Sequence, residues 1–178
     1  LVGSEMCIRD RYNAHEVHIK NHKKDMVQVC TLLSIKTGGC PEDCGYCSQS
    51  IHSKDPIEST PLMSLEEVEK QAKLAKQQGS TRFCMGAAWR RPSNKNIDRV
   101  IKMIDVVHNL GMESCVTLGM LSEDQANRLS KSGLNYYNHN LDTSREHYAK
   151  VISTRNYQDR LNTLKYVSSS GIKVCSGG

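Results

Sequence analysis

The chain has 178 residues, of which 38% are apolar and 24% charged, and this is enough for one domain with a hydrophobic core. Its net charge of +5 comes from 24 basic residues scattered among 19 acids, and aromatic residues make up only 5%, which argues against a nucleic-acid surface. A mean hydropathy of -0.54 and the lack of a membrane-length apolar run argue against a membrane protein.

Eight cysteines occur in a sequence without a signal peptide. This usage is typical of a reducing compartment, where cysteines bind metals more often than they form disulfides. We therefore expect a cytoplasmic protein, or a mitochondrial-matrix protein in a eukaryote, although no transit peptide is visible.

The first 26 residues are expected to contribute no chemistry. Residues 1–12, LVGSEMCIRDRY, lack an initiator Met and resemble translated adapter sequence, so we exclude them and Cys7 from the fold. Residues 13–26 are polar and carry His15, His18 and His22. An exposed arm is favoured there over a metal site, because no cysteine or carboxylate partner is evident.

Strand and helix patterns alternate from residue 27 onward. Apolar runs predict strands over 27–35, 81–85, 113–118, 134–141 and 172–175, with Cys30 packed in the core of the first. Between them lie amphipathic helical patterns, two of which begin with predicted capping boxes, Ser64 with Glu67 and Ser122 with Gln125. The alternation predicts a parallel sheet with crossover helices.

Periodicity alone leaves a closed barrel and an open doubly wound sheet as alternatives. Six residues with polar or sulfur side chains fall at or just past the predicted carboxyl ends of strands: Cys47, Cys84, Cys115, Asn140, Asp142 and Cys175. A (β/α)₈ barrel gathers its active site at that end, so we predict such a barrel. Residues 27–178 would form its first five strands, a truncated domain that we expect to be inactive by itself.

The loop after the first strand carries the most specific motif. Residues 38–47, GGCPEDCGYC, place Cys40, Cys44 and Cys47 in a CxxxCxxC pattern. Thiolates select iron–sulfur clusters and zinc. A structural zinc site needs four ligands, and His52 is the only local candidate for a fourth, so a cluster with one open iron is favoured.

This motif resembles the signature of the radical S-adenosylmethionine (SAM) enzymes. The stretches CTLLSIKTGGCPEDCGYCSQS, TRFCMGAAWR, YYNHNLDTS and GIKVCSGG further resemble the biotin synthase family over residues 27–178. The resemblance implies a barrel, a 4Fe–4S cluster on the three loop cysteines, and SAM cleavage to a 5′-deoxyadenosyl radical. That radical would activate dethiobiotin for sulfur insertion, the last step of biotin biosynthesis.

The resemblance also implies a second, 2Fe–2S cluster that is the source of the sulfur. Its ligands would be Cys84, Cys115, Cys175 and an arginine from a later strand beyond residue 178. From spacing alone, each of these cysteines is better explained as a small buried hydrophobe. Arg82 lies on the same strand face as Cys84, where it is either a positive neighbour of the cluster or an ordinary exposed arginine.

Further residues match family positions that hold SAM or substrate. The resemblance implies SAM contacts from Tyr46, Gly86, Asn140, Asp142 and Arg160, and substrate contacts from Lys36 and Asn140. Carboxylates suit ribose hydroxyls and arginine suits a carboxylate. For Lys36 a surface position is the alternative, and His139 is expected to be structural because strand alternation points it away from Asn140.

The family also implies partners: a flavodoxin-type electron donor, the iron–sulfur assembly machinery, and a second copy in a homodimer of the full-length enzyme. Two other functions stay open on the motif alone. One is another radical SAM reaction, which would need no cysteines on the later strands. The other is a non-catalytic iron–sulfur or zinc protein.

Overall fold

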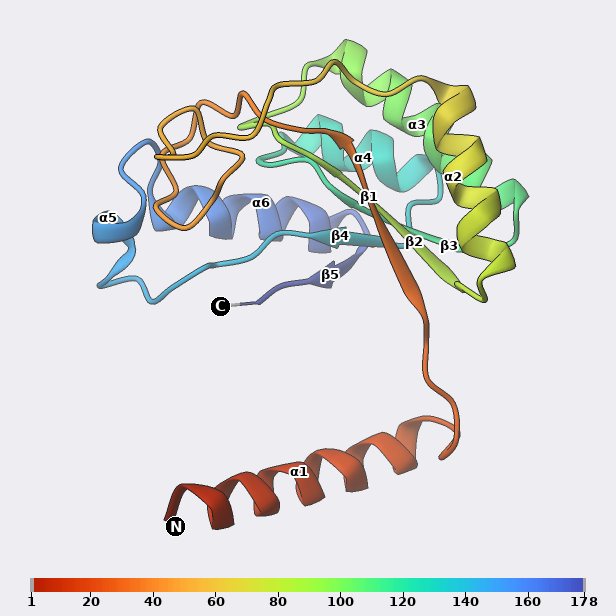
Figure 1. The fold of residues 1–178 in the computed structure, drawn as a ribbon, viewed down its shortest axis with the longest axis vertical. Coiled ribbons are helices and arrows are strands. Elements are labelled where there is room, and N and C mark those ends of the chain that lie inside the picture. Colours follow the sequence, from red (N-terminus) through yellow and green to blue (C-terminus); the bar gives the residue numbers. More distant parts are fainter. Residues whose placement is uncertain (1, 178) are drawn as a thin grey trace.

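In the computed structural model, which describes residues 2–177 and the side chains of residues 7–177, five parallel strands form one sheet in chain order. They are β1 (Cys30–Lys36), β2 (Arg82–Ala87), β3 (Glu113–Thr117), β4 (Tyr136–Asn138) and β5 (Lys173–Cys175) (Figure 1). Leu1 and Gly178, the outermost residues of the adapter-like segment and of the last motif, lie outside the described residues. The order and direction are those of the first five strands of a (β/α)₈ barrel.

A helix follows each of the first four strands. These helices are α2 (Leu65–Gln77), α3 (Asn94–Asn109), α4 (Glu123–Lys131) and α6 (Tyr157–Ser169), with the single turn α5 (Tyr148–Val151) between β4 and α6. They lie together on one side of the sheet (Figure 1). No helix in the described part of the chain is long and apolar enough to cross a membrane.

The two faces of the sheet differ because successive side chains of a strand point to opposite sides. On the helix side, Phe83, Met85 and Val116 are fully buried and belong to the main hydrophobic core. On the other side Leu32 is 68% exposed. This second face is the one that lines the interior of a barrel, and we call it the open face.

Helix α1 (Val2–Asn21) stands apart from the sheet (Figure 1). It runs without a break through the boundary predicted between the adapter-like segment and the N-terminal arm. His18 and His22 stack with ring centroids 5.3 Å apart near its end, and none of the described side chains of the helix belongs to the main core. The proposal that residues 1–12 are foreign to the fold stays a prediction.

Local signals in the sequence located most elements. Of the two predicted capping boxes, one is present and the other prediction was wrong. Ser122 and Gln125 form the complete box at the start of α4. At α2, Ser64 accepts a hydrogen bond from the Glu67 amide, but the Glu67 carboxylate accepts from Gln71 Nε2 at 2.8 Å. The Glu67 side chain has a helical neighbour four residues on, and it prefers that neighbour to the cap.

Candidate functional site

The three cysteines of the CxxxCxxC motif lie in a loop that closes on itself. The Cys40 amide donates to the Gln49 carbonyl and the Ile51 amide donates to the Cys40 carbonyl, both at 3.0 Å. Inside this closure the Cys47 amide donates to the Cys44 carbonyl at 3.0 Å. We call residues 38–51 the cluster loop.

Glycine is required where the cluster loop begins. Gly38 has φ +59°, and a Cβ built on it would lie 2.4 Å from the carbonyl oxygen of Ile57. Both the left-handed backbone and the close approach exclude a side chain. The GG of the motif is therefore a backbone requirement of the loop.

Asp43 fastens the cluster loop to the segment between α5 and α6. Its carboxylate accepts hydrogen bonds from the amides of Ser153 at 2.9 Å and Thr154 at 3.1 Å, and also from both hydroxyls. The bonds from Ser153 above all hold the pKa of Asp43 well below its usual range. Beside this clamp, the Gly45 amide donates to the Val151 carbonyl at 3.0 Å.

Cys44 meets a buried arginine at the back of the loop. Arg155 Nη2 donates to Cys44 Sγ at 3.3 Å, and Arg155 Nε lies 3.7 Å from the Glu42 carboxylate. The Arg155 side chain is only 5% exposed and that of Glu42 only 2%. Burial raises the pKa of Cys44, and the charge of Arg155 opposes this rise.

In front of the loop lies a cavity of about 320 Å³ that gathers the residues assigned to SAM and substrate. It is lined by two cluster-loop cysteines and by the residues of the resemblance: Lys36, Cys40, Tyr46, Cys47, Gly86, Asn140, Asp142 and Arg160. They come from the carboxyl ends of β1, β2 and β4 and from α6, far apart in the sequence. The tertiary structure brings this whole predicted set together.

Asp142 and Arg160 pair with each other in this cavity. The Arg160 guanidinium bonds the Asp142 carboxylate and also donates from Nε to the Tyr148 hydroxyl at 3.1 Å. Asp142 has φ 71°, the only described residue other than glycine with positive φ. Such strain persists only where the surroundings impose it, so the pair is a rigid polar corner of the cavity.

Lys36 and Asn140 both contact backbone groups. Lys36 Nζ donates to the carbonyls of Gly38 and Ala88, the latter at 3.2 Å, and so ties the cluster loop to the end of β2. Asn140 Oδ1 accepts from the Gly177 amide at 3.0 Å. Both side chains lie at the cavity wall, but their hydrogen bonds go to backbone groups and hold neighbouring segments together.

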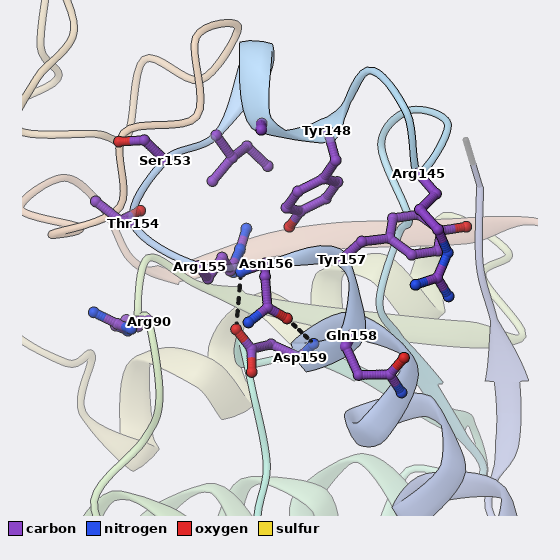
Figure 2. Close-up of a pocket in the computed structure, with 12 residues that line it drawn as sticks. Arg90, Arg145, Tyr148, Ser153, Thr154, Arg155, Asn156, Tyr157, Gln158 and Asp159 are labelled. Atoms are coloured by element: carbon purple, nitrogen blue, oxygen red, sulfur yellow. Dashed lines mark hydrogen bonds between the residues drawn. The ribbon is translucent and has the colours of Figure 1, made fainter.

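A second cavity, of about 780 Å³, lies behind the loop between α5 and α6 (Figure 2). Figure 2 shows Tyr148 and Tyr157 at its wall, with ring centroids 5.5 Å apart, and Arg145 over the Tyr157 ring. It contains none of the sequence-predicted site residues. It is larger than the cavity in front of the loop, but it lacks the thiols and the Asp142–Arg160 pair.

The strand cysteines share the open face of the sheet. Cys84 and Cys115 are direct partners on β2 and β3, and Cys175 is the partner of Asn138 one rung further along. The prediction that all three lie at strand ends was wrong for Cys84 and Cys115, which sit inside their strands. They lie deeper toward the middle of the sheet because β2 runs three residues past Cys84 and β3 runs two residues past Cys115.

The thiols of Cys84 and Cys115 interact. Cys84 has a pKa raised well above its usual range by a hydrogen bond to Cys115 and by burial, and the same bond lowers the pKa of Cys115. Arg82 lies on this face, where it bonds the Glu113 carboxylate at 2.8 Å and stacks 3.6 Å over the Tyr136 ring. Its charge favours the thiolate form of both cysteines.

The structure changes the positions that were predicted for Cys30 and His139. Cys30 does not pack in the core, because it occupies the open face of β1 and is exposed. His139 is buried, as a structural residue should be, and burial lowers its pKa to about 3. It nevertheless lines the cavity in front of the loop, which strand alternation did not predict because β4 ends at Asn138.

Comparison with known proteins decides the family. Residues 34–178 match the sequence profile described as the Radical SAM superfamily. The chain belongs to the radical SAM superfamily. Members of this superfamily bind a 4Fe–4S cluster and SAM.

Relatives with curated names show a more specific similarity within the superfamily. The chain is 58% identical over 167 residues to the biotin synthase of Acidithiobacillus ferrooxidans and to that of Thioalkalivibrio sulfidiphilus. The matches cover 94% of this chain but 53% and 49% of those proteins. The chain thus spans about half the length of the curated relatives it matches.

Solved structures agree on the fold. An FeFe-hydrogenase maturase from Carboxydothermus hydrogenoformans matches with a TM-score of 0.78 at 21% identity, over 93% of this chain and 39% of that one. A methylornithine synthase matches with a TM-score of 0.75 at 17% identity, over 87% of this chain and 45% of that one. These matches show that the chain shares the fold of those enzymes.

The residues of this radical SAM chain suit the superfamily's cluster. The cluster loop offers three thiols as soft ligands, and Arg155 provides a positive charge against one of them. Within the described residues, no three His, Cys, Asp or Glu side chains converge tightly enough to hold a single metal ion.

Sequence reasoning missed the groups that support this radical SAM site from behind. Arg155, Asp43 and Glu42 were not identified, although Glu42 and Asp43 lie inside the quoted motif. Both acids were interpreted only as loop-forming residues. Burying an acid normally requires a partner, and two consecutive acids between ligand cysteines were the signal that could have revealed these contacts.

Proposed function

We propose that this radical SAM protein is a biotin synthase, which converts dethiobiotin to biotin by inserting sulfur. The 58% identity to proteins of that name supports the proposal. The observation that carries it is the placement of Cys84, Cys115 and Cys175 on one face of the sheet. Another radical SAM reaction has no need of thiols at those three strand positions.

The cluster loop performs the first task. Cys40, Cys44 and Cys47 would hold the 4Fe–4S cluster, which would supply the electron for SAM cleavage. Three protein thiolates would leave a coordination position for SAM. The Asp43 clamp and the Gly38 turn fix the loop, so that the ligands keep their positions when SAM enters.

The cavity in front of the loop orients SAM. Asp142 accepts hydrogen bonds from ribose hydroxyls and Arg160 pairs with the methionine carboxylate. Because these side chains are paired with each other, SAM binding requires that they share their hydrogen bonds with the ligand. Gly86 contributes by the lack of a side chain at the cavity wall, and Tyr46 contributes an aromatic edge.

Substrate and sulfur are handled deeper on the open face. Asn140 and Lys36 offer polar groups at the cavity wall to the ring of dethiobiotin. Cys84, Cys115 and Cys175 would hold the 2Fe–2S cluster, which would supply the sulfur atom. A flavodoxin-type donor, the iron–sulfur assembly machinery and a second copy of the protein complete the proposed partners.

A chimera tests the proposal. Residues 27–178 would replace the corresponding segment of the Acidithiobacillus ferrooxidans biotin synthase, and the chimera would be produced in a bacterium that lacks its own enzyme. We expect growth without added biotin, loss of growth with Cys115→Ala, and no effect of the exposed-loop control Lys54→Ala. A soluble chimera that cleaves SAM but does not support growth would contradict the proposal and favour another radical SAM reaction.

A further inference from the structure

The cavity of about 780 Å³ behind the cluster loop, which we call the rear cavity, has no part in the proposed function described above. Its wall reaches a cluster ligand directly. Arg155 lines the rear cavity and donates from Nη2 to Cys44 Sγ at 3.3 Å. Tyr148 and Ile152 also line it, and they pack with Cys44 in a small buried apolar cluster. A single layer of side chains therefore lies between the rear cavity and a ligand sulfur.

Aromatic rings continue this layer toward the surface (Figure 2). Tyr157 packs against the same buried cluster, with its ring centroid 5.5 Å from that of Tyr148 and its ring nearly perpendicular. The exposed Arg145 places its guanidinium 4.8 Å from the centre of the Tyr157 ring. Side chains in contact thus lead from an exposed arginine to the buried surroundings of Cys44.

Exposed arginines surround the mouth of the rear cavity. Arg90 and Arg145 line it, and Arg90 and Arg91 line a neighbouring hollow of about 360 Å³. All three arginines are exposed. Glu146, the residue after Arg145, is an exposed acid. Asp159 lines both hollows, but its carboxylate accepts a hydrogen bond at 2.9 Å from the amide at the start of α6.

The other acids close to the rear cavity lie inside the rim and are already paired. The Glu42 carboxylate is 3.1 Å from Arg90 Nε and 3.7 Å from Arg155 Nε, and its side chain is only 2% exposed. Asp43 accepts hydrogen bonds from the amides of Ser153 and Thr154. Because the arginines lie outside and the paired acids inside, a partner that approaches the rear cavity meets positive charge first.

The rear cavity borders the cluster loop on the side opposite the proposed SAM site. In the proposed function, SAM fills the cavity in front of the loop, and dethiobiotin and the second cluster take the open face of the sheet. Cleavage of SAM consumes one electron, which has to reach the cluster loop while SAM is bound. The rear cavity stays accessible in that state and leads to Cys44 through one layer of side chains.

We propose that the rear cavity and its rim of Arg90, Arg91 and Arg145 form the docking surface for the electron donor, a small acidic protein that carries one electron at a time. This inference rests on the proposed function and adds the surface that its donor uses. The donor loses one electron and the oxidised 4Fe–4S cluster gains it, so no covalent bond forms or breaks. Electron-transfer partners meet over small areas, and opposite charges speed their association.

The first experiment measures binding and requires no cluster. A bacterial flavodoxin with a fluorescent label is titrated with the 178-residue chain at low ionic strength, and the anisotropy gives the dissociation constant. Arg91→Glu combined with Arg145→Glu should raise this constant roughly tenfold, because the rim then repels the acidic partner. The control combines Lys102→Glu with Lys131→Glu, which changes the net charge equally at exposed positions that line neither hollow. It should alter the constant by less than about twofold.

The second experiment measures electron transfer in the chain reconstituted with iron and sulfide. Freeze-quench electron paramagnetic resonance follows the reduced 4Fe–4S cluster after mixing with flavodoxin hydroquinone. The arginine double variant should be reduced roughly tenfold more slowly than the parent, and added salt should slow the parent but not the variant. Photoreduced deazariboflavin, an uncharged reductant, should reduce both at the same rate because it needs no charged docking surface.

Three outcomes would overturn the inference: unchanged binding and reduction in the arginine variant, an equal loss in the lysine control, or a parent chain that does not bind flavodoxin. Failure of the proposed function is read separately, from growth of the chimera. The two are distinguishable because binding of flavodoxin to the cluster-free chain requires neither SAM nor dethiobiotin.

Discussion

Arg155 is the one charged side chain in direct contact with a cluster-loop sulfur among the described hydrogen bonds. It donates to Cys44 Sγ at 3.3 Å from a nearly buried position. Hydrogen bonds and charge near the sulfurs set the reduction potential of an iron–sulfur cluster. We therefore expect Arg155 to act on the site through the reduction potential of the cluster.

Replacing Arg155 by Gln should lower the midpoint potential of the 4Fe–4S cluster. Reduction adds a negative charge that Arg155 stabilises, so its loss favours the oxidised state. We expect a decrease on the order of 60 mV, which equals a tenfold change in a one-electron equilibrium, measured by a potentiometric titration followed by electron paramagnetic resonance.

The control is Arg145→Gln, because Arg145 stacks on Tyr157 in the same region and does not contact a thiol. Its potential should match that of the parent. Equal shifts in both variants would show that the effect is one of general charge and not of the contact with Cys44.

One short carboxylate makes several of the contacts between the cluster loop and the α5–α6 segment. Asp43 lies 110 residues before Ser153 in the sequence, and its hydrogen bonds add to those of Gly45 with Val151 and of Arg155 with Cys44. Because a carboxylate accepts several bonds at once, one side chain fixes both backbones. The cluster loop thereby acquires the rigidity of the sheet that carries α6.

Asp43→Ala should loosen this clamp. The amides of Ser153, Thr154 and Gly45 should exchange their hydrogens at least tenfold faster, as measured by hydrogen exchange on the cluster-free chain, because local opening would cost less free energy. Asp55→Ala, an exposed acid of the same connection, is the control. Unchanged amide exchange rates in Asp43→Ala would mean that the hydrogen bonds of Asp43 do not stabilise the cluster loop in solution.

The sequence predicted a capping box at the start of α2 and another at the start of α4. The residue at the third helical position makes different contacts in the two helices. Gln125 of α4 is buried, accepts from the Ser122 amide at 3.1 Å and donates to the Pro92 carbonyl at 2.9 Å. Glu67 of α2 makes only the bond to Gln71. The same sequence pattern thus holds a tertiary contact in one helix and a surface contact in the other.

Gln125→Ala should lower the free energy of unfolding by about 2 kcal/mol, since it leaves buried polar groups without partners. Glu67→Ala, at the matching helix position, should cost no more than about 0.5 kcal/mol, as is usual for a surface change. Urea unfolding of both variants measures the difference. Equal costs would show that the tertiary bonds of Gln125 contribute little.

Two sets of thiols, one in the cluster loop and one on the open face of the sheet, are the basis of the two clusters in the proposed function. The cluster-loop set lies within eight residues of sequence, whereas the strand set exists only once the sheet has formed. The two sets should therefore be separable by mutation.

Cys44→Ala should remove the loop cluster and leave the iron of the strand site, and Cys115→Ala should do the reverse. Mössbauer spectra of the reconstituted proteins distinguish the two cluster types, and Cys7→Ala should alter neither. Loss of both clusters in each single variant would show that the sites are not independent.

The sequence by itself determined the parallel α/β architecture, the cluster loop and the superfamily. These depend on local properties: periodic apolar residues, glycines at left-handed positions such as Gly38, and three cysteines close together along the chain. The cavity residues were also identified from sequence, through the resemblance carried by their motifs.

Only the tertiary structure decided what the loop and the strands meet. The partners of Asp43 and Cys44 lie more than 100 residues away, and no local pattern encodes such a contact. The same holds for Cys30, whose apolar neighbours in the sequence predicted a core position. Its side chain is on the open face because strand register and alternation fix the direction of each side chain, and the register is set only when β1 pairs with β2.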